Sequence, residues 1–155
     1  MSGVQSFLLA IDLAARQRDH AAQGLVQAQT IHLLAQDQMA QLTSYATETE
    51  SKWITTAQGG TSPELLRHQY QFMDRLQQAM GLQNGVIENE NRKETAAKRL
   101  LVAAEFRLVS LKQFLKKKRA AMALVQSRRE QKQMDEFAAM SSRRVSTGHF
   151  TGEKL

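Results

Sequence analysis

Residues 58–64 read Gln-Gly-Gly-Thr-Ser-Pro-Glu, and this stretch lies between two long heptad patterns. Glycines leave helical geometry at little cost because they have no Cβ atom. Ser62 is a favourable N-cap, with Pro63 at the first helical position. Thr61 and Glu64 offer an alternative capping box. The stretch therefore predicts a hairpin tip at residues 58–62 that joins two helices.

Before the tip, residues on one stripe recur with alternating steps of four and three. Eleven of these fourteen positions are apolar, and Ala recurs among them. A 3.5-residue period held this long indicates a coiled-coil seam, and small residues allow close approach of the partner helix. The positions are Phe7, Ile11, Ala14, Arg18, Ala21, Leu25, Ala28, His32, Ala35, Met39, Leu42, Ala46, Thr49 and Trp53.

After the tip, the same stepping continues from Leu66 to Val125. Its polar members Glu90 and Glu94 predict a weaker stretch. Residues 81–85, Gly-Leu-Gln-Asn-Gly, compete as a turn, but the heptad phase runs through them unbroken, which favours a soft or bent point inside one helix. The positions are Leu66, Gln69, Met73, Leu76, Met80, Gln83, Ile87, Glu90, Glu94, Ala97, Leu101, Ala104, Leu108, Leu111, Leu115, Lys118, Met122 and Val125.

These patterns predict an all-α fold, a two-helix antiparallel coiled-coil hairpin with a C-terminal helical overhang. We expect one domain over residues 1–140, with helices at about 7–57 and 63–140. Folding about the tip pairs residues whose numbers sum to about 121, so the second helix outlasts the first. Residues 141–155 lose the periodicity and are expected to form a flexible basic tail.

Composition narrows the functional classes. The chain has no cysteine, which excludes disulfides and cysteine-ligated metals, and no apolar run approaches the roughly 20 residues that span a bilayer. Its four histidines are scattered without metal-binding spacing, and no phosphate-binding glycine loop is present. His32, on the seam, fits a partly buried, hydrogen-bonded residue. Adjacent Asp135 and Glu136 point apart on a helix. We therefore expect no enzyme, no metal and no cofactor.

Basic charge is concentrated in one segment. Residues 112–132 carry eight Lys and Arg against Glu130 alone, a net +7 in a chain whose total is +6. Such a run suits a solvated helix face, a docking element for an acidic protein, or a phosphate-binding surface. Phe114 is its one aromatic and no base-reading motif occurs, which makes nucleic acid an unlikely partner. Membrane insertion is disfavoured because no broad apolar face is present.

The chain resembles the FliJ family of flagellar type III export proteins over residues from about Phe7 to Arg144. The most specific part is residues 129–138, Arg-Glu-Gln-Lys-Gln-Met-Asp-Glu-Phe-Ala. Further matches are Asp12-Leu13-Ala14 and Tyr70-Gln71-Phe72, the latter followed by Leu76 and Ala79. The resemblance implies a cytoplasmic component, peripheral at the inner face of the cell membrane at the flagellar base.

The resemblance also implies partners and contact residues. The partners are the export ATPase FliI, whose ring the chain ends enter like a stalk, the export gate protein FlhA, and export chaperones. Gate contact maps onto Gln38, Leu42, Tyr45, Phe72, Leu76 and Ala79. ATPase-ring contact maps onto Gln131, Lys132, Met134, Asp135 and Glu136, with basic support from Lys116, Lys117, Arg128 and Arg129.

Several alternatives stay open. Leu42 and Leu76 fit the seam as well as a partner-facing patch, whereas Tyr45 and Phe72 lie off the seam and favour a partner. Thr49 and Gln83 depart from the family pattern, which puts part of the gate contact in doubt. The competing functions are a stalk of a virulence type III secretion system, a generic basic coiled-coil scaffold, and a nucleic-acid-binding rod.

Overall fold

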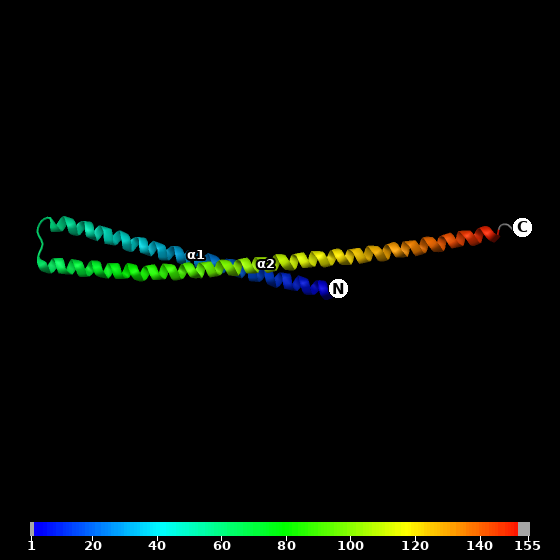
Figure 1. The fold of residues 1–155 in the computed structure, drawn as a ribbon, viewed down its shortest axis with the longest axis horizontal. Helices are drawn as coiled ribbons and strands as arrows, with labels where there is room; N and C mark the ends of the chain where they lie inside the picture. Colours follow the sequence, from blue (N-terminus) through cyan, green and yellow to red (C-terminus); the bar gives the residue numbers. More distant parts are fainter. Residues whose placement is uncertain (1, 152–155) are drawn as a thin grey trace. The chain divides into compact units, whose positions relative to one another are not determined.

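A computed structural model describes the backbone of residues 2–151 and the side chains of residues 3–146. Two helices make up the described chain, α1 (Ser2–Ala57) and α2 (Pro63–Thr151), and they run antiparallel from the connection at residues 58–62 (Figure 1). The described part contains no strand. The predicted all-α, two-helix antiparallel hairpin is confirmed.

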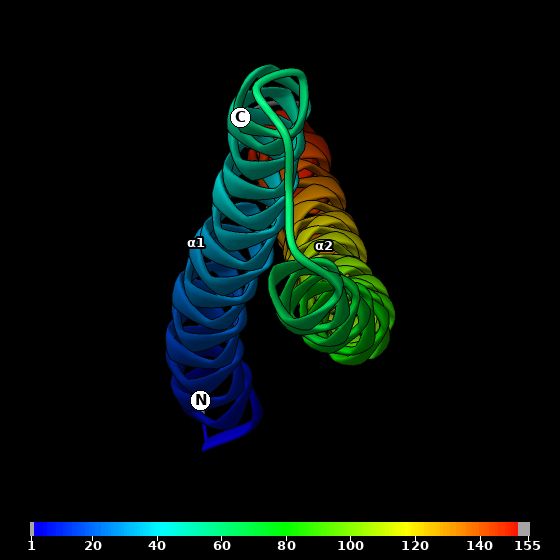
Figure 2. The ribbon, with the colours of Figure 1, turned by 90° about the vertical axis from the view of Figure 1, so that its left-hand side faces the viewer.

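Local hydrogen bonds define the tip. The Ser62 hydroxyl accepts a hydrogen bond from the Leu65 amide at 3.2 Å, as an N-cap does, and Pro63 opens α2. Gly60 has a φ of 98°, a region that disfavours side chains with a Cβ. The amides of Gly59 and Gly60 close the end of α1 on the carbonyls of Thr56 and Ala57. Figure 2 looks onto this connection.

The heptad seam is the inward stripe of both helices. All fourteen seam positions of α1, from Phe7 to Trp53, are buried or half-buried, and so are those of α2 from Gln69 to Lys118. Burial is shallow. Only two alanines and three leucines are buried among the described apolar residues, and a single seam encloses no central core. They are Ala14, Ala35, Leu76, Leu108 and Leu115.

Contacts group the chain into two compact units, and the single domain expected over residues 1–140 stays a prediction. The hairpin unit is Asp12–Leu108, and the terminal unit combines Met1–Ile11 with Val109–Leu155. Each layer of a two-helix hairpin touches only its neighbours, so no shared core ties distant layers together. In the terminal unit, the Lys118 ammonium lies 5.1 Å from the centre of the Phe7 ring, a cation–π contact.

Both helices extend beyond their expected ends. α1 begins at Ser2 rather than near Phe7, and α2 continues to Thr151 rather than ending near Met140. Where the heptad pattern ends, the helix loses its packing partner but keeps its backbone hydrogen bonds. Each further residue only extends a helix that is already nucleated. The expected tail from 141 is therefore helical to Thr151, and its last part, 152–155, lies outside the described residues.

Residues 81–85 are also helical, so α2 passes through the competing turn without interruption. Gly81 and Gly85 face open space, with nothing within 4 Å of where a Cβ would stand. No steric need for glycine exists at either position, and the unbroken heptad phase gave the correct structure.

Candidate protein-interaction surfaces

One candidate surface is the gate patch (Gln38, Leu42, Tyr45, Phe72, Leu76 and Ala79), which lies within the hairpin unit. The Tyr45 and Phe72 rings meet edge-to-face, with centroids 6.0 Å apart and planes at 79°. Such a pair adds about 0.5–1.5 kcal/mol beyond the area that it buries. Tyr45 remains 52% exposed, and Phe72 is half-buried. The off-seam aromatics therefore shield each other in part and still present an apolar surface.

Two other apolar members of the gate patch, Leu42 and Leu76, belong to the seam, and Ala79 lies next to the seam position Met80. Leu76 is only 8% exposed, and Leu42 and Ala79 are half-buried. Their burial shows that these side chains contribute to the packing of the hairpin. Tyr45 and the half-buried Phe72 are therefore the accessible aromatic residues of the gate patch, whereas Leu76 is occupied in packing within the hairpin.

Gln83, one of the two departures from the family pattern, has a structural role. Its side-chain amide donates to the Ala35 carbonyl at 2.8 Å and to the Gln38 side-chain oxygen at 3.2 Å. The numbers of Gln38 and Gln83 sum to 121, the predicted register. Thr49, the other departure, is half-buried on the seam.

The weaker stretch predicted near Glu90 and Glu94 is a polar layer of the hairpin unit. Glu94 lies 2.6 Å from the Nδ1 atom of His32, so the seam histidine is partly buried and hydrogen-bonded as expected. The hydrogen bond from His32, joined by the charges of Lys98 and His32 and opposed by burial, lowers the pKa of Glu94. Glu90 is 9% exposed and pairs with Lys93 at 3.2 Å.

A second candidate surface is the overhang, residues 119–146 of α2, in which every side chain is exposed. It contains the residues expected to contact the ATPase ring, Gln131, Lys132, Met134, Asp135 and Glu136, together with Arg128 and Arg129. Lys116 and Lys117 are exposed just before it, whereas Lys118 is half-buried against Phe7. No described part of α1 covers these residues.

Sequence reasoning did not assign Phe137 to a contact surface. Phe137 is 73% exposed and Met134 is 71% exposed. With Ala138, Ser141 and Val145 they follow helical spacing and so share one face of α2. That spacing was visible in the sequence. Large apolar side chains this exposed make the face a candidate protein-contact surface.

The described residues contain no cluster that could hold a metal ion. None of the described helices has an apolar stretch long enough to cross a membrane. The described residues form an α-helical hairpin with exposed candidate contact surfaces. This architecture is typical of proteins that act by binding other proteins.

Comparison with known proteins agrees with the sequence resemblance. The family model described as "Flagellar FliJ protein" matches residues 6–147, nearly the whole chain. The chain therefore belongs to the FliJ family, and it is a component of the flagellar export apparatus. Comparison with curated proteins and with solved structures found no significant match to the chain.

Proposed function

We propose that this chain is a non-catalytic, stalk-like regulator of the flagellar export ATPase that also links the ATPase to the export gate. The observation that supports the first part is the overhang, a long exposed helix with basic charge and exposed Met134, Phe137 and Met140. Basic residues steer a helix toward an acidic-lined ring, and apolar residues supply the close contact.

The decisive experiment measures ATP hydrolysis by the cognate export ATPase with and without this chain. We expect stimulation by the full chain and none by a chain that lacks residues 128–155. That truncation removes residues whose described side chains are all exposed, so the hairpin should stay folded, and circular dichroism checks this point.

Point variants separate the apolar contact from general charge. Phe137→Ala is expected to weaken ATPase binding by about 2 kcal/mol, roughly thirtyfold, as truncation of a contact hot spot does. Val26→Ala, at an exposed apolar position of α1 in the hairpin unit, is the matched control and should leave binding unchanged. Full stimulation by the chain lacking 128–155 would reject the proposal.

The second part of the proposal concerns the gate patch. Tyr45→Ala removes the exposed half of the aromatic pair and should weaken binding to the cytoplasmic domain of the export gate, measured by calorimetry. Leu76→Ala should weaken it only together with a loss of thermal stability, because Leu76 lies in the seam. Equal gate affinity for Tyr45→Ala and wild type would contradict this assignment.

The same proposal includes chaperone handling and a cytoplasmic position at the flagellar base, and membership of the FliJ family supports both. Phosphate binding by the basic segment is the competing function. It predicts binding to double-stranded DNA that weakens steeply as salt rises, with no effect on the ATPase.

A further inference from the structure

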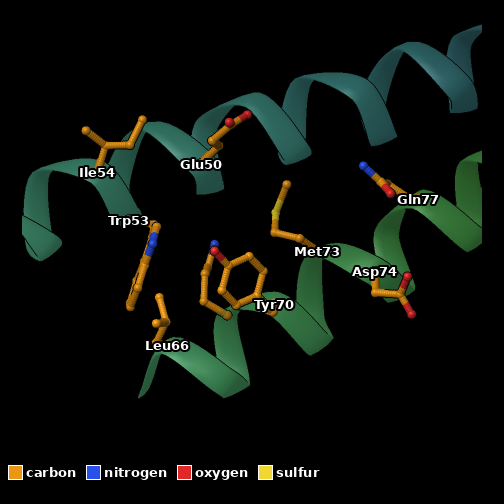
Figure 3. Close-up of a pocket in the computed structure, with 9 residues that line it drawn as sticks. Glu50, Trp53, Ile54, Leu66, Tyr70, Met73, Asp74 and Gln77 are labelled. Carbon is orange, nitrogen blue, oxygen red and sulfur yellow. The ribbon is translucent and has the colours of Figure 1, made fainter. Parts of the chain in front are cut away.

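A groove opens between α1 and α2 next to the tip, inside the hairpin unit (Figure 3). It has a volume of about 450 Å³, which is within the usual range of ligand-binding clefts. Trp53 extends from α1 toward Leu66 on α2, and Tyr70 and Met73 line the groove from α2 (Figure 3). All residues from 58 to 68 are exposed, so the helices do not close on each other there.

The groove is solvent-accessible, and its lining combines apolar side chains with polar ones. Tyr70 is 69% exposed, Ile54 is 54% exposed and Leu66 is 38% exposed. Leu66 has the correct heptad phase for the seam but is not buried by α1. An aromatic and aliphatic surface of this kind at the junction of two helices fits the apolar face of a third helix.

The charged residues of the groove indicate the chemistry of a helix that would bind there. The two charged residues that line the groove are both acidic, Glu50 on α1 and Asp74 on α2. Within the described residues, neither is in an ion pair, and Asp74 only accepts a hydrogen bond from Gln78 at 3.3 Å. A segment with lysine or arginine beside its apolar residues would complement both sides of the groove.

The groove and the aromatic pair of the gate patch lie on different faces of the hairpin. Successive residues of an α-helix are rotated by about 100°, so Tyr70 and Phe72 point to nearly opposite sides of α2. Tyr45 and Ile54, nine residues apart, likewise point to opposite sides of α1. A partner in the groove therefore leaves Tyr45 and Phe72 accessible.

We propose that this groove binds an amphipathic helical segment of another protein, with apolar residues that contact Trp53 and Tyr70 and basic residues that pair with Glu50 and Asp74. The groove follows α2 from Leu66 to Gln77, which is roughly 16 Å at 1.5 Å per residue. About three helical turns of the partner cover this length. The proposal does not depend on the ATPase or gate assignments.

The test selects helical peptides of about twelve residues from a displayed library on the immobilised full chain, a length that matches three turns. We expect enriched peptides to combine apolar residues at i, i+3 or i+4 and i+7 with flanking Lys or Arg. The double variant Glu50→Lys with Asp74→Lys should lose these peptides at least tenfold and select acidic ones instead. If that variant does not fold, the milder double variant Glu50→Gln with Asp74→Asn takes its place, and it should bind the selected peptides more weakly than wild type.

The matched control is Glu48→Lys with Glu88→Lys, which changes the net charge equally at exposed positions outside the groove. It should retain the peptides. Trp53 is the single tryptophan of the chain and lines the groove, so its emission should shift to shorter wavelength when a selected peptide binds.

Three outcomes would overturn the proposal. The first is that the selection enriches peptides without basic residues, or enriches no peptide at all. The second is equal binding to the groove variant and the control. The third is concentration-dependent self-association, measured by light scattering, that the groove variant abolishes, since this would assign the groove to a second copy of the chain.

Discussion

The contact between His32 and Glu94 shows how the polar residues of the seam find hydrogen-bond partners. Heptad phase placed both residues inward, where an isolated carboxylate is unfavourable. The structure pairs them at 2.6 Å, and Lys98 lies 3.5 Å from the same carboxylate. Glu94 is thus satisfied by a hydrogen bond that crosses from α2 to α1.

The lowered pKa of Glu94 gives this contact a pH dependence. A carboxylate whose pKa is lower in the folded state stabilises the fold above its unfolded pKa, and this stabilisation is lost as pH falls through the folded value. Glu94→Gln should therefore melt below wild type at neutral pH, and the difference should narrow in acid. Melting temperatures followed by circular dichroism test this, with exposed Glu88→Gln as the control whose difference should stay constant.

Ala35 marks a place where the helices approach closely. It is 3% exposed, and the Gln83 side chain bonds to its carbonyl at 2.8 Å. Ala35→Leu should overpack this layer and cost about 1–3 kcal/mol of unfolding free energy in urea titrations. Ala40→Leu, at an exposed position of α1, should change stability little. Equal unfolding free energies for the two variants would show that α1 and α2 can move apart at this layer without loss of stability.

At the scale of the element, the glycines of α2 and of the tip have opposite roles. Gly81 and Gly85 are helical with open space around them, whereas Gly60 adopts a φ of 98°. The helix needs no glycine at the first two positions, but the tip does at the third.

Replacing Gly81 and Gly85 together by Ala should raise the unfolding free energy by about 1–2 kcal/mol, because alanine is the better helix former. Gly60→Ala should lower it, since a Cβ is strained at that φ. Urea unfolding followed by circular dichroism measures both. A destabilised double variant would indicate that α2 must bend at these glycines.

At the scale of the whole molecule, stability is distributed unevenly. Residues 119–146 have no buried side chain, and a helix without tertiary contacts is marginal in water. Amide hydrogen exchange of the free chain should therefore be fast over residues 119–146 and slowest around Leu76 in the hairpin unit.

Saturating export ATPase should slow exchange over residues 119–146 and leave the layers around Leu76 almost unchanged. The matched sample is ATPase with the Phe137→Ala chain, in which this protection should decrease. Protection confined to the hairpin unit would place the ATPase contact elsewhere and contradict the proposed function.

Much of the fold could be predicted because its determinants are local. The 3.5-residue period identifies the inward stripe of each helix, and all fourteen seam positions of α1 are indeed buried or half-buried. Ser62, Pro63 and Gly60 define the tip through capping and backbone geometry. The family resemblance, confirmed over residues 6–147, rested on linear motifs. The ends of the helices were less predictable because a helix can continue without a seam.

The sequence by itself thus determined the fold class, the seam and the family of this protein. Only the tertiary structure decided that Leu76 lies within the seam, that Tyr45 packs against Phe72, and that a groove stays open beside Trp53. The physical reason is that a heptad fixes the direction of each side chain around its own helix axis. The distance between the two axes, and so what fills the space between them, depends on contacts between residues far apart in the chain.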